Sequence, residues 1–163
     1  MEEKIWYELL HTKFGDCYLN VYLESQKSIK KWVKIATLLF SSSGIMGWAF
    51  WKDAPIVSCI VITIIQLFNL VQKQIILSDI EIAHIANLKG LFFSHFNKVE
   101  KLWVDYRAGR ITEEAASESF YKLRKEYVKI EKLDTKLNVK ERDYLKKRAK
   151  KHIDAYISQY HNN

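Results

Sequence analysis

The stretch that decides the fold is Trp32–Val71, with the sequence WVKIATLLFSSSGIMGWAFWKDAPIVSCIVITIIQLFNLV. It contains two apolar runs without a charged residue, 35–51 and 54–71, separated only by Lys52-Asp53, and Pro55 opens the second run. A helix rises about 1.5 Å per residue, so each run extends about 26 Å and, with its flanks, reaches the roughly 30 Å of a bilayer core. The stretch therefore predicts a transmembrane helical hairpin. The alternative, a buried hairpin in a soluble bundle, would leave too little of a 163-residue chain to cover about forty nearly continuous apolar residues.

We expect an all-α membrane protein in three parts. Residues 1–31 form amphipathic cytoplasmic helices, and residues 32–73 form the transmembrane hairpin, with spans at 32–51 and 54–73. Residues 74–163 form a cytoplasmic helical tail, into which the second membrane helix continues. At 163 residues the chain has the length of one domain, and the tail is too short for an enzyme with a deep cleft.

Positive charges are unevenly distributed along the chain, which carries a net charge of +7. From Thr135 to the end, eight Lys and Arg residues stand against three acids, whereas the corner between the runs carries only Lys52, balanced by Asp53. By the positive-inside rule, both termini lie in the cytoplasm and the corner faces out. The acidic start of the chain argues against a signal peptide. We expect no disulfide, because Cys17 would be cytoplasmic and Cys59 would lie in the membrane. The lysines that crowd the entrance to the first run are Lys27, Lys30, Lys31 and Lys34.

The N-terminal segment has two helical stripes of apolar residues, one within 1–14 and one that begins at Cys17. Gly15-Asp16 interrupts the pattern, so we expect two helices here. One interpretation places them at the membrane surface, with Trp and Tyr side chains at the level of the headgroups. The other packs them on the cytoplasmic tail, and the sequence favours neither.

Polar side chains follow one face of the second apolar run at 100° per residue, whereas the opposite face is apolar. Amide side chains are unfavourable against lipid, so this face is expected to contact protein or water. It either lines a water-filled pore between subunits or forms interhelical hydrogen bonds that hold an oligomer together. Both interpretations predict a homo-oligomer. The candidate pore-lining residues are Thr63, Gln66, Asn69 and Lys73.

The chain after the hairpin contains no residue that must stop a helix before Ala108-Gly109, so one helix of about 80 Å is predicted from Ala54 to Tyr106. Apolar residues recur along it at heptad spacing and predict a coiled-coil-like seam. His84 and His95 lie eleven residues apart on one face, and a core or interface role suits them better than metal ligation. The seam consists of Ile85, Leu88, Phe92, His95, Val99, Leu102 and Tyr106, widened by Phe96 and Trp103.

Two further helices are expected in the tail. Gly109 suits a left-handed C-cap and Thr112 suits an N-cap, which predicts a turn between two helices. Leu133-Asp134-Thr135 is expected to break the second of these, and Asn138 with Glu141 resembles a capping box for the last helix. The expected apolar faces are Ala116, Phe120, Leu123, Tyr127 and Ile130, then Leu145, Ala149, Ile153, Tyr156 and Tyr160.

The last helix carries a basic run opposite its apolar stripe, formed by Lys146, Lys147, Arg148, Lys150 and Lys151. This run is a solvated face, a surface for anionic headgroups, or a site for a phosphate-bearing partner such as a nucleotide. Nucleic-acid binding is not expected, because the aromatic residues lie on the apolar stripe and not among the lysines. The sequence contains no glycine-rich phosphate loop, no metal-spaced Cys/His set and no nucleophile elbow. We therefore expect no enzyme, no metal and no cofactor.

Two motifs carry a family resemblance: Tyr106–Glu114, with the sequence YRAGRITEE, and Lys140–Lys151, with the sequence KERDYLKKRAKK. With the amphipathic lead, the two apolar runs and the long helix after them, they make nearly the whole chain resemble the SLATT family. These are the SMODS- and SLOG-associating two-transmembrane effector domains of prokaryotes. Members often carry a proline before the last helix, whereas residues 133–137 contain none.

The resemblance implies an oligomeric effector of anti-phage defence in the prokaryotic inner membrane. Such an effector permeabilises or disrupts the membrane when a cyclic (oligo)nucleotide, or a partner protein that senses nucleotides, signals infection. The candidate ligand-binding residues are then Arg107, Arg110 and Arg124, near the turn in the tail. The alternative function is a membrane-anchored scaffold whose cytoplasmic coiled coil recruits a partner through the seam around Phe92 and Val99.

Overall fold

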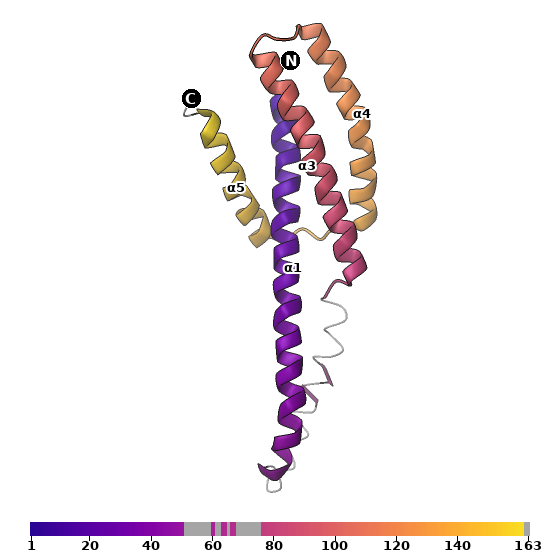
Figure 1. Ribbon diagram of the computed structural model, residues 1–163, viewed down its shortest axis with the longest axis vertical. Coiled ribbons are helices and arrows are strands. Elements are labelled where there is room, and N and C mark those ends of the chain that lie inside the picture. The colour runs from indigo at the N-terminus through magenta and orange to yellow at the C-terminus, as the bar shows by residue number, and fades with distance from the viewer. Residues whose placement is uncertain (51–59, 61–62, 65, 68–75, 162–163) are drawn as a thin grey trace. The chain divides into compact units, whose positions relative to one another are not determined.

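The computed structural model of the chain describes residues 1–50, 60, 63–64, 66–67 and 76–161, and the elements that it describes are all helices (Figure 1). The expected all-α class is confirmed for this part of the chain. The helices are α1 (Glu2–Phe50), α3 (Asp79–Arg107), α4 (Glu113–Leu137) and α5 (Asp143–His161).

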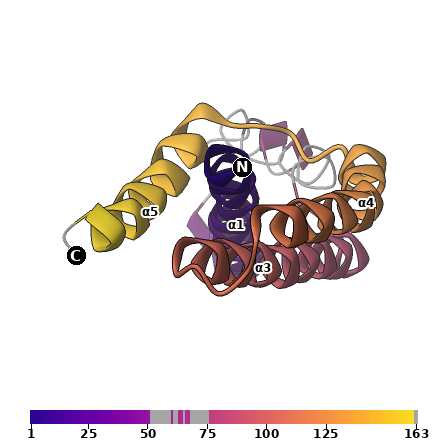
Figure 2. The ribbon, with the colours of Figure 1, turned by 90° about the horizontal axis from the view of Figure 1, so that it is seen from above.

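The chain divides into two compact units. The first, which we call the helical bundle, combines Met1–Leu23 with Ile82–Asn163, and the second is the 24–81 unit. Within the bundle, α4 and α5 lie on opposite sides of α1, and α3 runs beside α1 (Figure 2). Residues from the two ends of the sequence therefore build one core.

The first part of α1 is the central helix of that core. Ile5 and Leu9 are fully buried, and they pack with residues of α3 and α4. Of the two interpretations of the N-terminal segment, packing on the tail is therefore the one that the bundle adopts. The other buried members of the cluster are Phe96, Val99, Leu102, Trp103, Ala116 and Phe120.

The expected break at Gly15-Asp16 is wrong, because α1 continues through it. A Cβ at Gly15 would lie 2.3 Å from Cε1 of Phe92, so glycine here permits a close approach of α1 and α3. Glycine weakens a helix by roughly 0.5–1 kcal/mol relative to alanine, which neighbouring packing can offset. The sequence pattern alone does not distinguish these two uses of a glycine.

The expected continuous helix from Ala54 to Tyr106 is also wrong, because α3 begins at Asp79. Its start is a capping box: the Glu81 N–H donates to Ser78 Oγ at 3.2 Å, and the Ser78 N–H donates to Glu81 Oε2 at 2.8 Å. The Ser-x-x-Glu signature is visible in the sequence. Lys30 of α1 forms an ion pair with Asp79 within the 24–81 unit.

The predicted turn between α3 and α4 is confirmed. Gly109 has a φ of 66°, in the left-handed region, and the Thr112 side chain accepts the Ala115 N–H at 3.3 Å. The seam predicted on α3 is buried at Ile85, Phe92 and Val99. It packs against α1 and α4 of the same chain.

The expected break at Leu133-Asp134-Thr135 is wrong, since α4 continues to Leu137. Thr135 lies within the helix and its Oγ1 donates to the Glu131 carbonyl at 2.8 Å. Asn138 is the C-cap of α4, with a φ of 44°, and not the N-cap of α5, which begins at Asp143. Asparagine adopts this left-handed conformation more readily than most residues, so it ends a helix here.

Tyrosines fix α5 to the rest of the bundle. The Tyr18 hydroxyl donates to the Lys140 carbonyl at 3.0 Å and accepts the Arg142 N–H at 3.1 Å. Farther along, the Tyr156 hydroxyl donates to Glu100 Oε1 at 2.6 Å. Leu145 and Ala149 are fully buried, which confirms part of the predicted apolar stripe.

The expected membrane hairpin falls largely in the 24–81 unit. Among the described residues, no helix is both long enough and apolar enough to cross a membrane. Of the second run, 54–71, only Ile60, 63–64 and 66–67 are described, and the rest lies outside the described residues, together with Cys59.

The contact at Gly15 leads to a stability prediction. Gly15→Ala would push a methyl group into the Phe92 ring, which is nearly buried and packs edge-on against Tyr127 at 6.0 Å, so the ring cannot easily move. We expect the free energy of unfolding to fall by about 1–3 kcal/mol, measured by chemical denaturation followed by circular dichroism.

Gly90→Ala is the matched control, because a Cβ at Gly90 meets nothing within 4 Å. This change should leave stability unchanged or raise it by about 0.5–1 kcal/mol through helix propensity. Equal effects of the two substitutions would contradict the close-approach role of Gly15.

Candidate functional site

The predicted pore-lining residues lie in the 24–81 unit. Thr63 and Gln66 are helical and exposed, whereas Asn69 and Lys73 lie outside the described residues. The apolar neighbours Ile64 and Leu67 are each 56% exposed. In a single chain, therefore, these polar and apolar side chains alike are left uncovered.

Other large apolar side chains of the 24–81 unit are equally uncovered. Trp32 is 69% exposed and Leu38 is 62% exposed, although both belong to α1, whose first part is deeply buried in the bundle. Soluble monomers rarely leave large groups of apolar side chains in contact with water. We call the following residues the exposed apolar set: Trp32, Ile35, Leu38, Ile60, Ile64 and Leu67.

The three candidate ligand-binding arginines have separate partners. The guanidinium of Arg107 lies 5.1 Å from the ring centroid of Trp103, and Arg110 Nη1 lies 3.0 Å from Asp105 Oδ1. Arg124 is twelve residues into α4 from Thr112, which places it about 18 Å along the helix axis. The arrangement therefore gives no single anion site made from all three.

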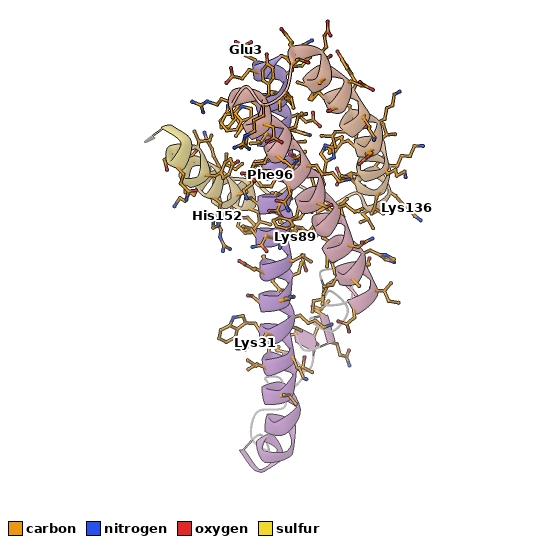
Figure 3. The ribbon with its side chains drawn as sticks, turned by 45° about the horizontal axis from the view of Figure 1, so that its top comes forward. Glu3, Lys31, Lys89, Phe96, Lys136 and His152 are labelled. Atoms are coloured by element: carbon orange, nitrogen blue, oxygen red, sulfur yellow. The ribbon has the colours of Figure 1, made fainter. Side chains whose placement is uncertain are left out.

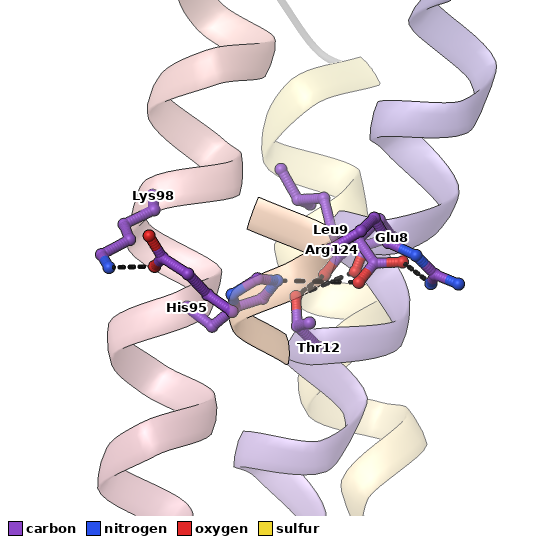
Figure 4. Close-up of polar contacts among 7 residues, drawn as sticks. Glu8, Leu9, Thr12, His95, Lys98 and Arg124 are labelled. Atoms are coloured by element: carbon purple, nitrogen blue, oxygen red, sulfur yellow. Dashed lines mark hydrogen bonds and ion pairs between the residues drawn. The ribbon is translucent and has the colours of Figure 1, made fainter. Parts of the chain in front are cut away.

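Arg124 belongs instead to a buried polar group that we call the Glu8 network: Glu8, His95, Arg124 and Tyr127. Arg124 Nη1 donates to Glu8 Oε2 at 2.7 Å, and His95 Nε2 lies 3.6 Å from Glu8 Oε1 (Figure 4). Neither His95 Nε2 nor Glu8 Oε1 has a hydrogen-bond partner among the described residues. One carboxylate thus joins α1 to both α3 and α4.

The charge of Glu8 is stabilised by its neighbours. Burial raises the pKa of this carboxyl, but His95 and Arg124 lower it by more, so the pKa lies below the ordinary value of 4.5. Glu8 is therefore ionised near neutral pH although it is 3% exposed. A buried carboxylate is tolerated when it is paired and hydrogen-bonded.

Tyr127 closes the network from α4. Its ring centroid lies 5.0 Å from that of His95, and burial raises the pKa of Tyr127 far above its usual value. The phenol is therefore neutral, and the group contains the paired charges of Glu8 and Arg124. In the sequence, His95 lies within an apolar seam and Glu8 lies between the apolar residues Ile5 and Leu9. These positions indicate that both side chains are buried, but they do not show that the two are in contact.

A second polar group lines an open cavity of about 470 Å³ between α1, α3 and α5. Lys89 of α3 and His152 of α5 reach it at the same level of α1 (Figure 3). Asp16 of α1 lies at its wall, is 8% exposed, and has a buried Oδ1 without a partner among the described residues. Burial raises the pKa of Asp16, and the nearby Lys89 and Lys13 partly offset this.

The basic run of α5 faces solvent over most of its length. Lys147, Lys150 and Lys151 are exposed, and Lys146 forms an ion pair with Glu141. In the part of the chain that the structure describes, no group of His, Cys, Asp and Glu side chains is placed to hold a metal ion.

Comparisons with family models, curated proteins and solved structures found no match to this chain.

The Glu8 network predicts a difference between two carboxylates. Glu8→Gln removes a buried charge from Arg124 and His95, so we expect the free energy of unfolding at neutral pH to fall by about 1–3 kcal/mol. Glu126→Gln removes an exposed pair with Lys98 at 2.7 Å and should cost much less. Chemical denaturation of both variants measures the contrast, and a similar loss in the two would contradict a special role for Glu8.

The same network predicts a pH dependence. Because the pKa of Glu8 is lowered on folding, its contribution is fully present above the unfolded value of about 4.5 and is lost as pH falls through the lower folded value. The stability advantage of the wild type over Glu8→Gln should therefore shrink as pH falls below about 4.5. Parallel acid titrations of thermal stability check this, and an advantage that grows in acid would show that the sign is wrong.

Proposed function

We propose that this chain is an oligomeric membrane protein that permeabilises the prokaryotic inner membrane in a nucleotide-controlled anti-phage defence system. Residues 32–73 would enter the bilayer as a hairpin, with both termini and the helical bundle in the cytoplasm. The observation that supports this best is the exposed apolar set of the 24–81 unit. The defence role and the nucleotide signal rest on the resemblance to SLATT domains.

The exposed apolar set has a large energetic consequence. Burying one large apolar side chain contributes about 1.5–3 kcal/mol, so covering the six members would be worth roughly 10 kcal/mol. A bilayer supplies such cover, and so do further copies of the chain. The two charge-free runs, 35–51 and 54–71, make lipid the better match for most of this surface.

Lysines lie at the start of the exposed apolar set, between the bundle residues of α1 and the first charge-free run. Lys27, Lys31 and Lys34 are exposed, and the corner between the runs has only Lys52, next to Asp53. Basic residues remain on the cytoplasmic side of a membrane helix and can contact anionic headgroups there. This distribution supports cytoplasmic termini.

The polar stripe supports assembly into an oligomer. Thr63 and Gln66 are exposed beside apolar residues of the same helical segment, and the sequence continues the stripe through Asn69 and Lys73. A glutamine that faces hydrocarbon leaves its amide without hydrogen bonds, so it favours a position against protein or water. Several copies with these faces turned inward would enclose a polar path through the membrane.

The alternative function, a membrane-anchored scaffold, depended on the seam of α3. Phe92 and Val99 are buried within the helical bundle, so they are not free for a partner's coiled coil. A scaffold would have to use another surface, and no observation here favours one.

Substitutions in the stripe test the proposal. In bacteria that express the chain, a potential-sensitive dye should report depolarisation under the activating condition, and Gln66→Leu should reduce it by at least about tenfold because the polar path is interrupted. Ile64→Leu, which keeps an apolar side chain in the same segment, should depolarise like the wild type. Depolarisation that persists in Gln66→Leu, or a protein that fractionates without membranes, would contradict the proposal.

A further inference from the structure

The cavity between α1, α3 and α5 has features of a binding site that neither the sequence motifs nor the proposed pore explains. Its volume of about 470 Å³ is in the range of small-molecule sites. It is lined from three helices that are far apart in sequence, and hydrogen-bonding side chains predominate. The lining residues that matter here are Lys13, Asp16, Asn20, Lys89, His152 and Gln159.

Asp16 is the unusual member of this group. Its Oδ1 is buried and has no partner within the described residues, and the whole residue is only 8% exposed. A buried carboxylate with too few hydrogen bonds costs free energy, and a donor that reaches Asp16 from the cavity would recover part of it. Such a donor is an N–H of an amine or of a nitrogen heterocycle.

The two nearby lysines are held by groups other than Asp16. Lys89 Nζ donates to Asn20 Oδ1 at 2.8 Å, and Lys13 Nζ lies 4.4 Å from the ring centroid of Phe96. Both ammonium groups nevertheless lie close enough to lower the pKa of Asp16. In the cavity, the carboxylate of Asp16 is therefore not hydrogen-bonded to either lysine. A ligand with a hydrogen-bond donor at one end and an anion at the other would contact the carboxylate and the lysines separately.

The charges favour a phosphate as the anionic end. Lys13 and Lys89 supply two positive charges against the single negative charge of Asp16. A phosphate monoester carries about −1.5 to −2 at neutral pH, enough to pair with both lysines, whereas one carboxylate carries only a single charge. Lysine binds phosphate as a point charge from a flexible chain, so no fixed fork geometry is needed.

We propose that this cavity binds a small phosphate monoester that also carries an N–H donor, with Asp16 accepting the N–H and Lys89, Lys13 and His152 holding the phosphate. A nucleoside monophosphate and an aminoalkyl phosphate, such as a lipid headgroup fragment, share this chemistry. A bound ligand would link α5 to α1 and α3. Its role in control rests on the proposed function, but its binding does not.

Calorimetry on the purified full-length chain in detergent tests the inference with three probes: inorganic phosphate, adenosine monophosphate and O-phosphoethanolamine. At least one of the two esters should bind about tenfold or more tightly than inorganic phosphate, because only the esters carry an N–H donor for Asp16. The ester that binds more tightly identifies the source: adenosine monophosphate indicates a nucleotide, and O-phosphoethanolamine indicates a headgroup.

Three variants locate the site. Lys89→Gln should weaken all probes that bind by about tenfold or more, since it removes a charge-assisted contact to phosphate. Asp16→Asn should abolish the preference for the ester, and its thermal stability should not fall, because it removes a buried charge that has no hydrogen bond at Oδ1. Lys147→Gln, an exposed lysine of α5 outside the cavity, should bind like the wild type.

Three results would overturn the inference. They are no binding of either ester at millimolar concentration, equal losses in Lys147→Gln and Lys89→Gln, and an unchanged ester preference in Asp16→Asn. Because binding is measured without a membrane, these results leave the proposed membrane function untouched. Intact binding together with absent depolarisation would instead count against that function alone.

Discussion

The close approach of α1 and α3 at Gly15 is the constraint on which the helical bundle depends. Because Gly15 has no side chain, the Phe92 ring occupies the place where a Cβ would lie. This contact fixes the register between the two helices. In that register Leu9 packs in the same cluster as Phe96 and Val99, and Glu8 lies opposite His95. A bulkier residue at position 15 would disturb an apolar core and the buried contact between Glu8 and His95 at the same time.

The Glu8 network gives the same register a second determinant. Apolar packing tolerates small shifts, because many arrangements of similar volume have similar energy. A buried carboxylate does not, since Glu8 loses its partner if α4 slides and Arg124 moves away from the 2.7 Å contact. The network therefore favours one alignment of α1, α3 and α4 over others that would bury equal apolar area. It does so even if its net contribution to stability is small.

Sequence periodicity predicts the apolar faces of the tail because helical spacing is a local property: Val99, Ala116 and Ala149 are buried where the pattern places them. The turn at Gly109 is likewise predictable, because backbone conformation and cap chemistry are local. The role of Gly15 is not, since a glycine breaks a helix or admits a neighbour depending on what lies opposite. The partners of Glu8, and the separation of the three candidate arginines, depend on contacts between distant segments. The start of α3 at Asp79 was predictable from its capping box.

The helix α1 shows that side chains of one element meet different surroundings in the two units. Apolar side chains such as Leu9, Leu19 and Val21 are buried in its first part, whereas Trp32 and Leu38 are exposed farther along, with no interruption of the helix between them. Helix propensity does not change at that boundary, so the change lies in what surrounds the side chains. In the bundle the surroundings are α3, α4 and α5, which the chain itself supplies. In the 24–81 unit, Trp32 and Leu38 have no comparable cover from the chain, although they belong to the same helix.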